Sequence, residues 1–228
     1  MLLFMVFAAI IVAVENHITK QQCSDVVVVN LHNEYRSQLI NGTLKNKDYK
    51  YMPRGGNMFE MRWSKDLEKS AQERANEYDL RARNSDKSIG ENIYINFPVE
   101  TVGKAIIAAC TDAVKDWWLE LSTEYGDNPT NNFTHTVFSQ NFLHFTQMAW
   151  GKTHKIGCGS ALHYNYGHKI NVVCHYLPRG NVENELIYEL GEPCKDHSDC
   201  DIGKCLKESG LCRKTEKSIF GRLFRYPV

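Results

Sequence analysis

Two stretches carry the strongest signal in this sequence: His144-Phe145-Thr146-Gln147-Met148-Ala149-Trp150, which leads into Ile156-Gly157-Cys158-Gly159, and Val172-Val173-Cys174-His175-Tyr176-Leu177-Pro178-Arg179-Gly180-Asn181. Residues 155–176, which join the two stretches, predict a β-hairpin. Its strands are expected over 155–162 and 169–176, with a turn at Asn165-Tyr166-Gly167. Because Cys158 and Cys174 then lie on adjacent strands, we expect a disulfide between them.

Both stretches resemble the two signature motifs of the CAP superfamily, which comprises cysteine-rich secretory proteins, antigen 5 and pathogenesis-related proteins. There is one departure at each: Leu143 stands where the family mostly has Gly before the His, and Asn171 occupies a usually apolar position. The resemblance covers residues 25–190, and the chain looks most like helminth members of the venom-allergen-like type. It implies a three-layer α/β/α sandwich.

The hydrophobic pattern by itself also predicts a mixed α and β domain. Apolar residues three or four apart indicate a helix over 26–40, and a second apolar face runs from Leu67 to Ala82 behind Ser64 as N-cap. A third helix is predicted from about Pro98 to Glu120, and residues 125–141 are predicted to be a loop with at most one helical turn. With a short strand at 92–95, the helices flank a small antiparallel sheet, which gives an α+β fold.

The N-terminus and the cysteines indicate an oxidising compartment. Residues 1–14 are uncharged and too short to span a bilayer, so we interpret them as a signal peptide cleaved after Ala13. All eight cysteines follow this segment, which favours four disulfides over free thiols or a zinc site. The sequons at Asn41 and Asn132 are then candidate glycosylation sites.

The composition changes near Glu192. Residues 191–212 have few bulky apolar side chains and hold four cysteines: Cys194, Cys200, Cys205 and Cys212. We expect these to pair with one another, in any of three connectivities, because short loops cost little entropy to close; Cys23 then pairs with Cys110. The segment resembles the cysteine-rich extension of helminth CAP proteins. The basic tail, residues 213–228, is interpreted as a solvated terminus, with a membrane-surface helix as the alternative.

Members of the CAP superfamily often have a cleft lined by two His and two Glu. The matching positions are His144, Glu91 in Gly90-Glu91-Asn92, and Glu120 at the end of Trp117-Trp118-Leu119-Glu120. The second His is missing, because Asn84 occupies the corresponding position. No cofactor is expected beyond weak binding of a divalent metal such as zinc by His144. The alternative role of the His144 side chain is a hydrogen bond to Glu91 or Glu120.

Motifs for catalysis are missing from the sequence. It contains no His-Glu-x-x-His helix, Gly-x-Ser-x-Gly elbow or phosphate-binding Gly loop. The cysteines are assigned to disulfides, and Ser85, beside Asn84, lacks a histidine base. We therefore expect no enzymatic activity. The alternative is a degenerate metal-dependent hydrolase in which Glu91, Glu120 and His144 perform acid–base chemistry.

The resemblance and the composition also limit the partners. The net charge of zero gives no indication of a nucleic acid partner, and no second apolar run approaches the length of a membrane span. Five aromatic residues near His144 either fill the core or present a lipid site: Tyr125, Phe133, Phe138, Phe142 and Phe145. The resemblance therefore implies a secreted, extracellular, non-enzymatic protein that binds a protein receptor or a lipid or sterol.

Overall fold

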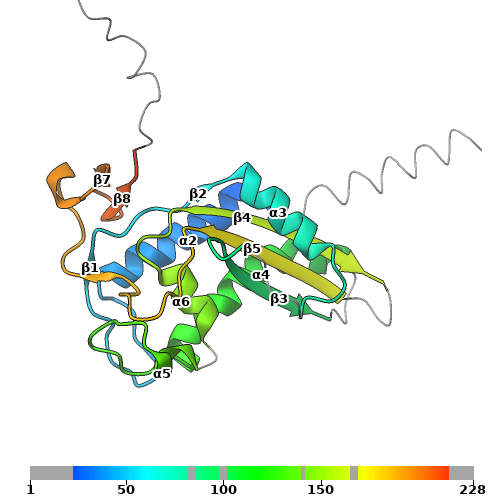
Figure 1. Ribbon diagram of the computed structural model, residues 1–228, viewed down its shortest axis with the longest axis horizontal. Helices are drawn as coiled ribbons and strands as arrows, with labels where there is room; N and C mark the ends of the chain where they lie inside the picture. Colours follow the sequence, from blue (N-terminus) through cyan, green and yellow to red (C-terminus); the bar gives the residue numbers. More distant parts are fainter. Residues whose placement is uncertain (1–22, 82–85, 98–101, 140–141, 165–168, 216–228) are drawn as a thin grey trace, which may run out of the picture.

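The computed structural model describes residues 23–81, 86–97, 102–139, 142–164 and 169–215, with the backbone alone for part of this (Figure 1). Five predicted features lie outside these residues: the signal peptide, Asn84, Ser85, the hairpin tip and residues 216–228 of the basic tail. Among the described helices, none has the length and apolar character needed to cross a membrane.

A four-stranded sheet forms the centre of the domain. Its strands are β2 (Arg62–Trp63), β3 (Gly90–Asn96), β4 (Lys155–His163) and β5 (Lys169–Leu177), in the order β2-β4-β5-β3. The predicted hairpin is β4–β5, and β3 pairs antiparallel with β5. However, β2 runs parallel to β4, so the sheet is mixed rather than antiparallel. A strand of two residues is too short to leave a periodic pattern in the sequence.

Helices cover both faces of the sheet (Figure 1). On one face lies α3 (Lys65–Ala75); on the other lie α2 (Asp25–Ile40), α4 (Val102–Thr123) and α6 (Leu143–Ala149). Successive side chains of β5 point to opposite faces of the sheet. Val173 packs against Ala71 and Ala75 of α3, whereas Val172 packs in the core on the other face. The α/β/α sandwich is therefore confirmed. The short α5 (His135–Phe138) is the single helical turn predicted for residues 125–141.

The helix α3 begins as predicted but ends early. Ser64 is its N-cap, and its Oγ accepts the Leu67 N–H at 3.4 Å. The helix ends at Ala75 rather than continuing to Ala82, and Asn171 of β5 donates to the carbonyl oxygens of Ala75 and Glu77. The polar residue at a usually apolar position of the second motif thus satisfies carbonyl groups at the end of a helix.

Four disulfides hold the chain together: Cys23–Cys110, Cys158–Cys174, Cys194–Cys205 and Cys200–Cys212. The last two select one of the three connectivities open to the extension.

This extension contains the 3₁₀ helix η1 (His197–Asp199) and the hairpin of β7 (Lys204–Leu206) and β8 (Leu211–Arg213). It is docked on the domain, because Phe59 packs on its cysteines and the Met58 carbonyl accepts the Cys212 N–H at 2.7 Å. A small sheet of β1 (Gly55–Gly56) and β6 (Glu189–Leu190) precedes it.

Candidate functional site

His144 and Glu120 form a pair between α6 and α4. His144 Nδ1 lies 2.6 Å from Glu120 Oε1, and Glu120 Oε2 accepts the Phe145 N–H at 2.9 Å. Since a carboxylate only accepts, Nδ1 carries the proton in the neutral imidazole, and Nε2 is the nitrogen that remains to accept a ligand. The ring lies against Trp117, with the centroids 5.9 Å apart, and the side chain is 36% exposed, so solvent reaches the pair.

Glu91 does not join this pair. Side chains alternate along β3: Asn92 Nδ2 donates to the His144 carbonyl at 3.1 Å, which places Asn92 on the face of α6. Glu91 therefore faces α3, where its Oε2 accepts from Arg74 Nε at 3.3 Å and from His175 Nε2 at 3.1 Å. The expected cleft of Glu91, Glu120 and His144 is divided by the sheet, because the register of β3 alternates its side chains between the two faces.

A second polar cluster surrounds Glu91. Ser70 Oγ of α3 lies 2.8 Å from His175 Nδ1 of β5, and His175 lies directly opposite Glu91 in the β3–β5 register. The sequence pattern singles out neither Ser70 nor His175 as a site residue. His175 belongs to the second motif, but its partner becomes visible only when the pairing of β3 with β5 is known.

The described residues do not form a complete metal site at His144. They supply one nitrogen ligand, His144 Nε2, with Glu120 as the carboxylate that orients the imidazole. Asn84 lies outside them. Over the described ranges, the one group of at least three His, Cys, Asp or Glu ligand atoms close together is Cys194, Cys200 and Cys212, and these sulfurs are in disulfides. This donor set fits weak zinc binding at most.

A buried arginine fixes the backbone that follows α6. Arg36 of α2 is fully buried and donates to the carbonyls of Phe59, Met148, Trp150, Gly151 and Thr153. Burial lowers the pKa of Arg36 to about 9. Two of these carbonyls, those of Met148 and Trp150, lie in the first motif, and those of Gly151 and Thr153 follow it directly, so Arg36 stabilises the chain path after His144.

The aromatic residues near His144 form the core. Four of the five are buried: Tyr125, Phe133, Phe142 and Phe145. Phe145 packs edge-on against Trp118, with ring centroids 5.1 Å apart, and Phe133 packs against Trp150 at 5.8 Å. Their burial supports the core interpretation for these four residues. Nothing is described of the Phe138 side chain.

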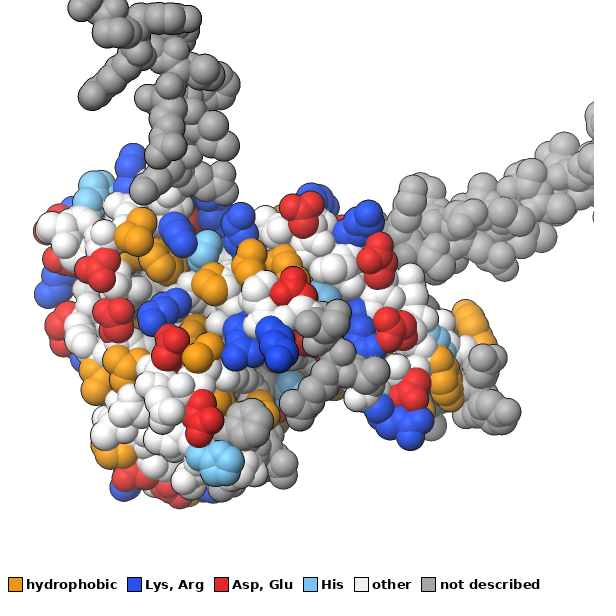
Figure 2. All heavy atoms as spheres, viewed as in Figure 1, with side chains coloured by type: hydrophobic (Ala, Val, Ile, Leu, Met, Phe, Trp, Pro, Cys, Tyr) orange, Lys and Arg blue, Asp and Glu red, His pale blue; other side chains and the backbone are white. Residues whose placement is uncertain are grey.

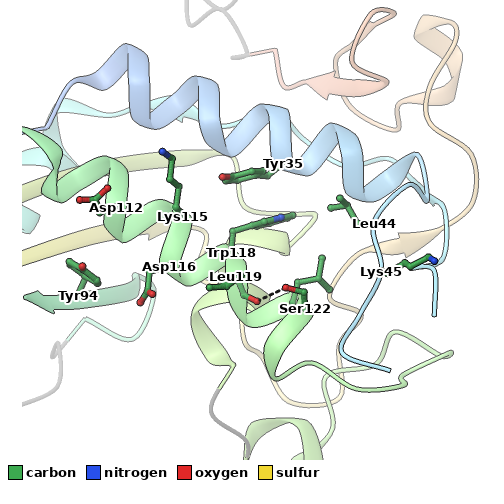
Figure 3. Close-up of a pocket in the computed structure, with 11 residues that line it drawn as sticks. Tyr35, Leu44, Lys45, Tyr94, Asp112, Lys115, Asp116, Trp118, Leu119 and Ser122 are labelled. Carbon is green, nitrogen blue, oxygen red and sulfur yellow. Dashed lines mark hydrogen bonds between the residues drawn. The ribbon is translucent and has the colours of Figure 1, made fainter. Parts of the chain in front are cut away.

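An apolar groove of about 560 Å³ lies instead between α2 and α4 (Figure 3). Tyr35 of α2 and Trp118 of α4 stack on each other in its wall, with centroids 4.9 Å apart and planes within 6°. Leucines of α4 and of the loop after α2 extend the apolar lining: Leu44, Leu119 and Leu121. Polar side chains complete it: Lys45, Tyr94, Asp112, Lys115, Asp116 and Ser122. Burial raises the pKa of Tyr94, and the Asp116 and Asp112 carboxylates add to this.

Comparison with known proteins identifies the family. The model described as "CAP: Cysteine-rich secretory protein family" matches residues 29–176. The chain belongs to the CAP family. Membership of this family, together with four disulfides, is consistent with secretion, and the family is generally without established enzymatic activity.

Similar proteins come from parasitic worms and from venoms. The structure of BmVAL-1 is 52% identical, with a TM-score of 0.80, and the match covers 86% of this chain and 95% of that one. The crystal structure of NaASP2 with Zn²⁺ is 31% identical, with a TM-score of 0.72, over 84% and 97% of the two chains. Venom allergen 5 of Dolichovespula arenaria is 34% identical, over 71% of this chain and 78% of its own length. The CAP protein is therefore venom allergen-like.

Some curated relatives are much longer. Ancylostoma secreted protein of Ancylostoma caninum is 31% identical over 85% of this chain, but the match spans only 47% of that protein. The chain thus spans about half the length of such relatives.

On the face shown in Figure 2, acidic and basic side chains are interspersed with small apolar areas.

Proposed function

We propose that this CAP protein acts outside the cell as a binding protein, and that its ligand is a fatty acid or a sterol held in the groove between α2 and α4. The observation that supports this is the apolar lining of the groove, with Tyr35 stacked on Trp118 and Leu119 beside them. Leu119 is 53% exposed at the edge of this lining, so its side chain is available to contact a ligand in the groove.

The size and lining of the groove suit a small lipid. Its volume of about 560 Å³ is in the range of ligand sites in proteins. An acyl chain or a ring system that buries about 200 Å² of apolar surface there would gain roughly 5 kcal/mol. The binding energy would come from apolar area, and the His144 imidazole is not part of the lining.

Titration of labelled palmitate and labelled cholesterol tests the proposal and distinguishes the two ligands. Leu119→Asp places a charge on the exposed rim without opening a core cavity, and it should weaken binding at least tenfold. Ile202→Asp is the matched control, because Ile202 is 52% exposed on the extension; it should bind like the native protein. Absence of saturable binding, or loss of binding in His144→Ala with no loss in Leu119→Asp, would reject the groove as the site.

Two other functions are alternatives to lipid binding. A protein receptor is the second class of partner implied by the resemblance, and receptor binding without lipid binding would favour it. The metal-dependent hydrolase loses support from the geometry, because Glu91 faces α3 whereas Glu120 and His144 lie on the other side of the sheet. Accordingly, we expect no sustained turnover of peptides or esters.

A further inference from the structure

Three side chains distant in sequence form a continuous hydrogen-bonded array on the α3 face of the sheet. Ser70 Oγ is 2.8 Å from His175 Nδ1, and His175 Nε2 is 3.1 Å from Glu91 Oε2. The order of hydroxyl, imidazole and carboxylate is the order that activates a serine for nucleophilic attack. This array contains neither His144 nor Glu120.

The protonation pattern of the array follows from its members. Glu91 is ion-paired with Arg74 and, as a carboxylate, can only accept hydrogen bonds. The proton of a neutral His175 is therefore on Nε2, and its Nδ1 is a bare acceptor. Ser70 Oγ therefore has two acceptors within reach, the Leu67 carbonyl at 3.1 Å and Nδ1 of a neutral His175 at 2.8 Å, and the reactive rotamer is the one in which its proton is donated to His175. This is the arrangement in which imidazole acts as a base toward serine.

The fold holds the array in place while leaving the serine accessible. His175 is 3% exposed, whereas Ser70 is partly exposed. The residue opposite His175 on β4 is Gly157, where a Cβ would lie 2.1 Å from the Glu68 backbone N. The helix α3 thus approaches the sheet closely at this point, which fixes Ser70 above His175. Arg74, one turn further along α3, holds the carboxylate of Glu91.

We propose that Ser70 is a nucleophile that accepts an acyl group from small activated esters. It also accepts a phosphonyl group from a fluorophosphonate, where Ser70 Oγ bonds to phosphorus, the P–F bond breaks, and fluoride leaves with the hydroxyl proton by way of His175. In the acyl transfer Ser70 Oγ bonds to the acyl carbon and the ester C–O bond breaks. The hydroxyl proton passes to His175 Nδ1 and from there to the leaving alkoxide, which departs as an alcohol. The product is an O-acyl serine, formed once per molecule. Glu91 is a positioning residue, because it sets the tautomer of His175. The inference is independent of lipid binding in the groove.

Labelling with a fluorophosphonate and with p-nitrophenyl acetate tests this proposal. Intact mass and peptide mapping should show a single adduct, on Ser70, with one burst of p-nitrophenol and no further release. Ser70→Ala should abolish the adduct, and His175→Gln should slow labelling at least tenfold. His135→Gln, an exposed histidine paired with Glu183, should label at the native rate.

Two further measurements separate activation from a structural role. Glu91→Gln should slow labelling at least tenfold, and a low-field proton resonance from the His175 Nε2–H in the native protein should disappear in this variant. If a variant fails to fold, the unmutated protein is labelled both in its folded state and unfolded in urea. Labelling in urea should be at least tenfold slower, because Ser70, His175 and Glu91 are then no longer hydrogen-bonded to one another. An adduct on another residue, no adduct on the native protein, or equal rates in native and unfolded protein would overturn the proposal.

Discussion

The Glu120 carboxylate contacts two consecutive residues of α6, with Oε1 2.6 Å from His144 Nδ1 and Oε2 2.9 Å from the Phe145 N. The helix α6 has no side-chain N-cap of its own, so Glu120 satisfies an N–H group in its first turn from the neighbouring helix. One side chain thus both orients the imidazole and stabilises the start of the helix that carries it.

Glu120→Ala should therefore lower the free energy of unfolding by about 1–3 kcal/mol, because a buried N–H and an imidazole N–H lose their acceptor. Glu120→Gln should cost less, since its amide oxygen can still accept one of these bonds. Urea denaturation measures both. Glu124→Ala is the control, because Glu124 is exposed, and it should change stability by less than about 0.5 kcal/mol. Equal losses in Glu120→Ala and Glu124→Ala would contradict the role of Glu120.

Zinc binding should be weak in the native protein and stronger in Asn84→His. His144 Nε2 is the one imidazole nitrogen identified at the site, and an amide oxygen is a poor zinc ligand beside it. If residue 84 reaches the site, a second imidazole completes the pair, and calorimetry should show tighter binding that is lost again when His144→Ala is added. Equal affinity in the native protein and in Asn84→His would show that residue 84 does not reach His144.

Local patterns in the sequence predict most of the fold. The helix over 26–40 and the hairpin containing Cys158 and Cys174 follow from spacing within single segments, and the structure has them within one or two residues at each end. The end of α3 could not be predicted in the same way. The helix ends at Ala75, and its terminal carbonyls are bound by Asn171, almost a hundred residues later in the chain.

The candidate site was predictable only in part. Motif matching identifies His144 and Glu120, and these two residues do form a pair. Motif matching also assigns Glu91 to this site. However, side chains alternate between the two faces along β3, and the Glu91 side chain lies on the face of Arg74 and His175. The face on which a strand residue lies depends on the register of the whole sheet, and a short motif such as Gly90-Glu91-Asn92 does not contain that information.

Replacement of Arg36 should be among the most destabilising single changes. Arg36→Met keeps much of the volume but leaves buried carbonyls without their donor, so the free energy of unfolding should fall by at least about 3 kcal/mol. Arg62→Met is the matched control, because Arg62 is exposed on β2, and it should be nearly neutral. Thermal or urea unfolding checks both. A loss of less than about 1 kcal/mol in Arg36→Met would show that water or a backbone shift replaces the guanidinium.

His32 should make the protein less stable in acid. It is fully buried, with Nδ1 2.8 Å from the Val28 carbonyl and Nε2 3.1 Å from the Tyr176 hydroxyl. Burial, with a smaller contribution from the Arg36 charge, lowers its pKa from 6.5 to about 4. The folded state thus holds His32 neutral, while the unfolded chain takes up a proton as the pH falls below 6.5.

The contribution of His32 is therefore complete above pH 6.5 and is lost as the pH falls toward 4. Between pH 7 and pH 4.5 this loss amounts to roughly 2–3 kcal/mol, at about 1.4 kcal/mol per pH unit. Urea unfolding at the two pH values should show the native protein losing more stability than His32→Gln by that amount, even though the variant starts lower at pH 7. The comparison isolates His32, because His154, whose pKa is also lowered by burial, titrates in both proteins. Parallel losses in the two proteins would show that His32 is not the group responsible.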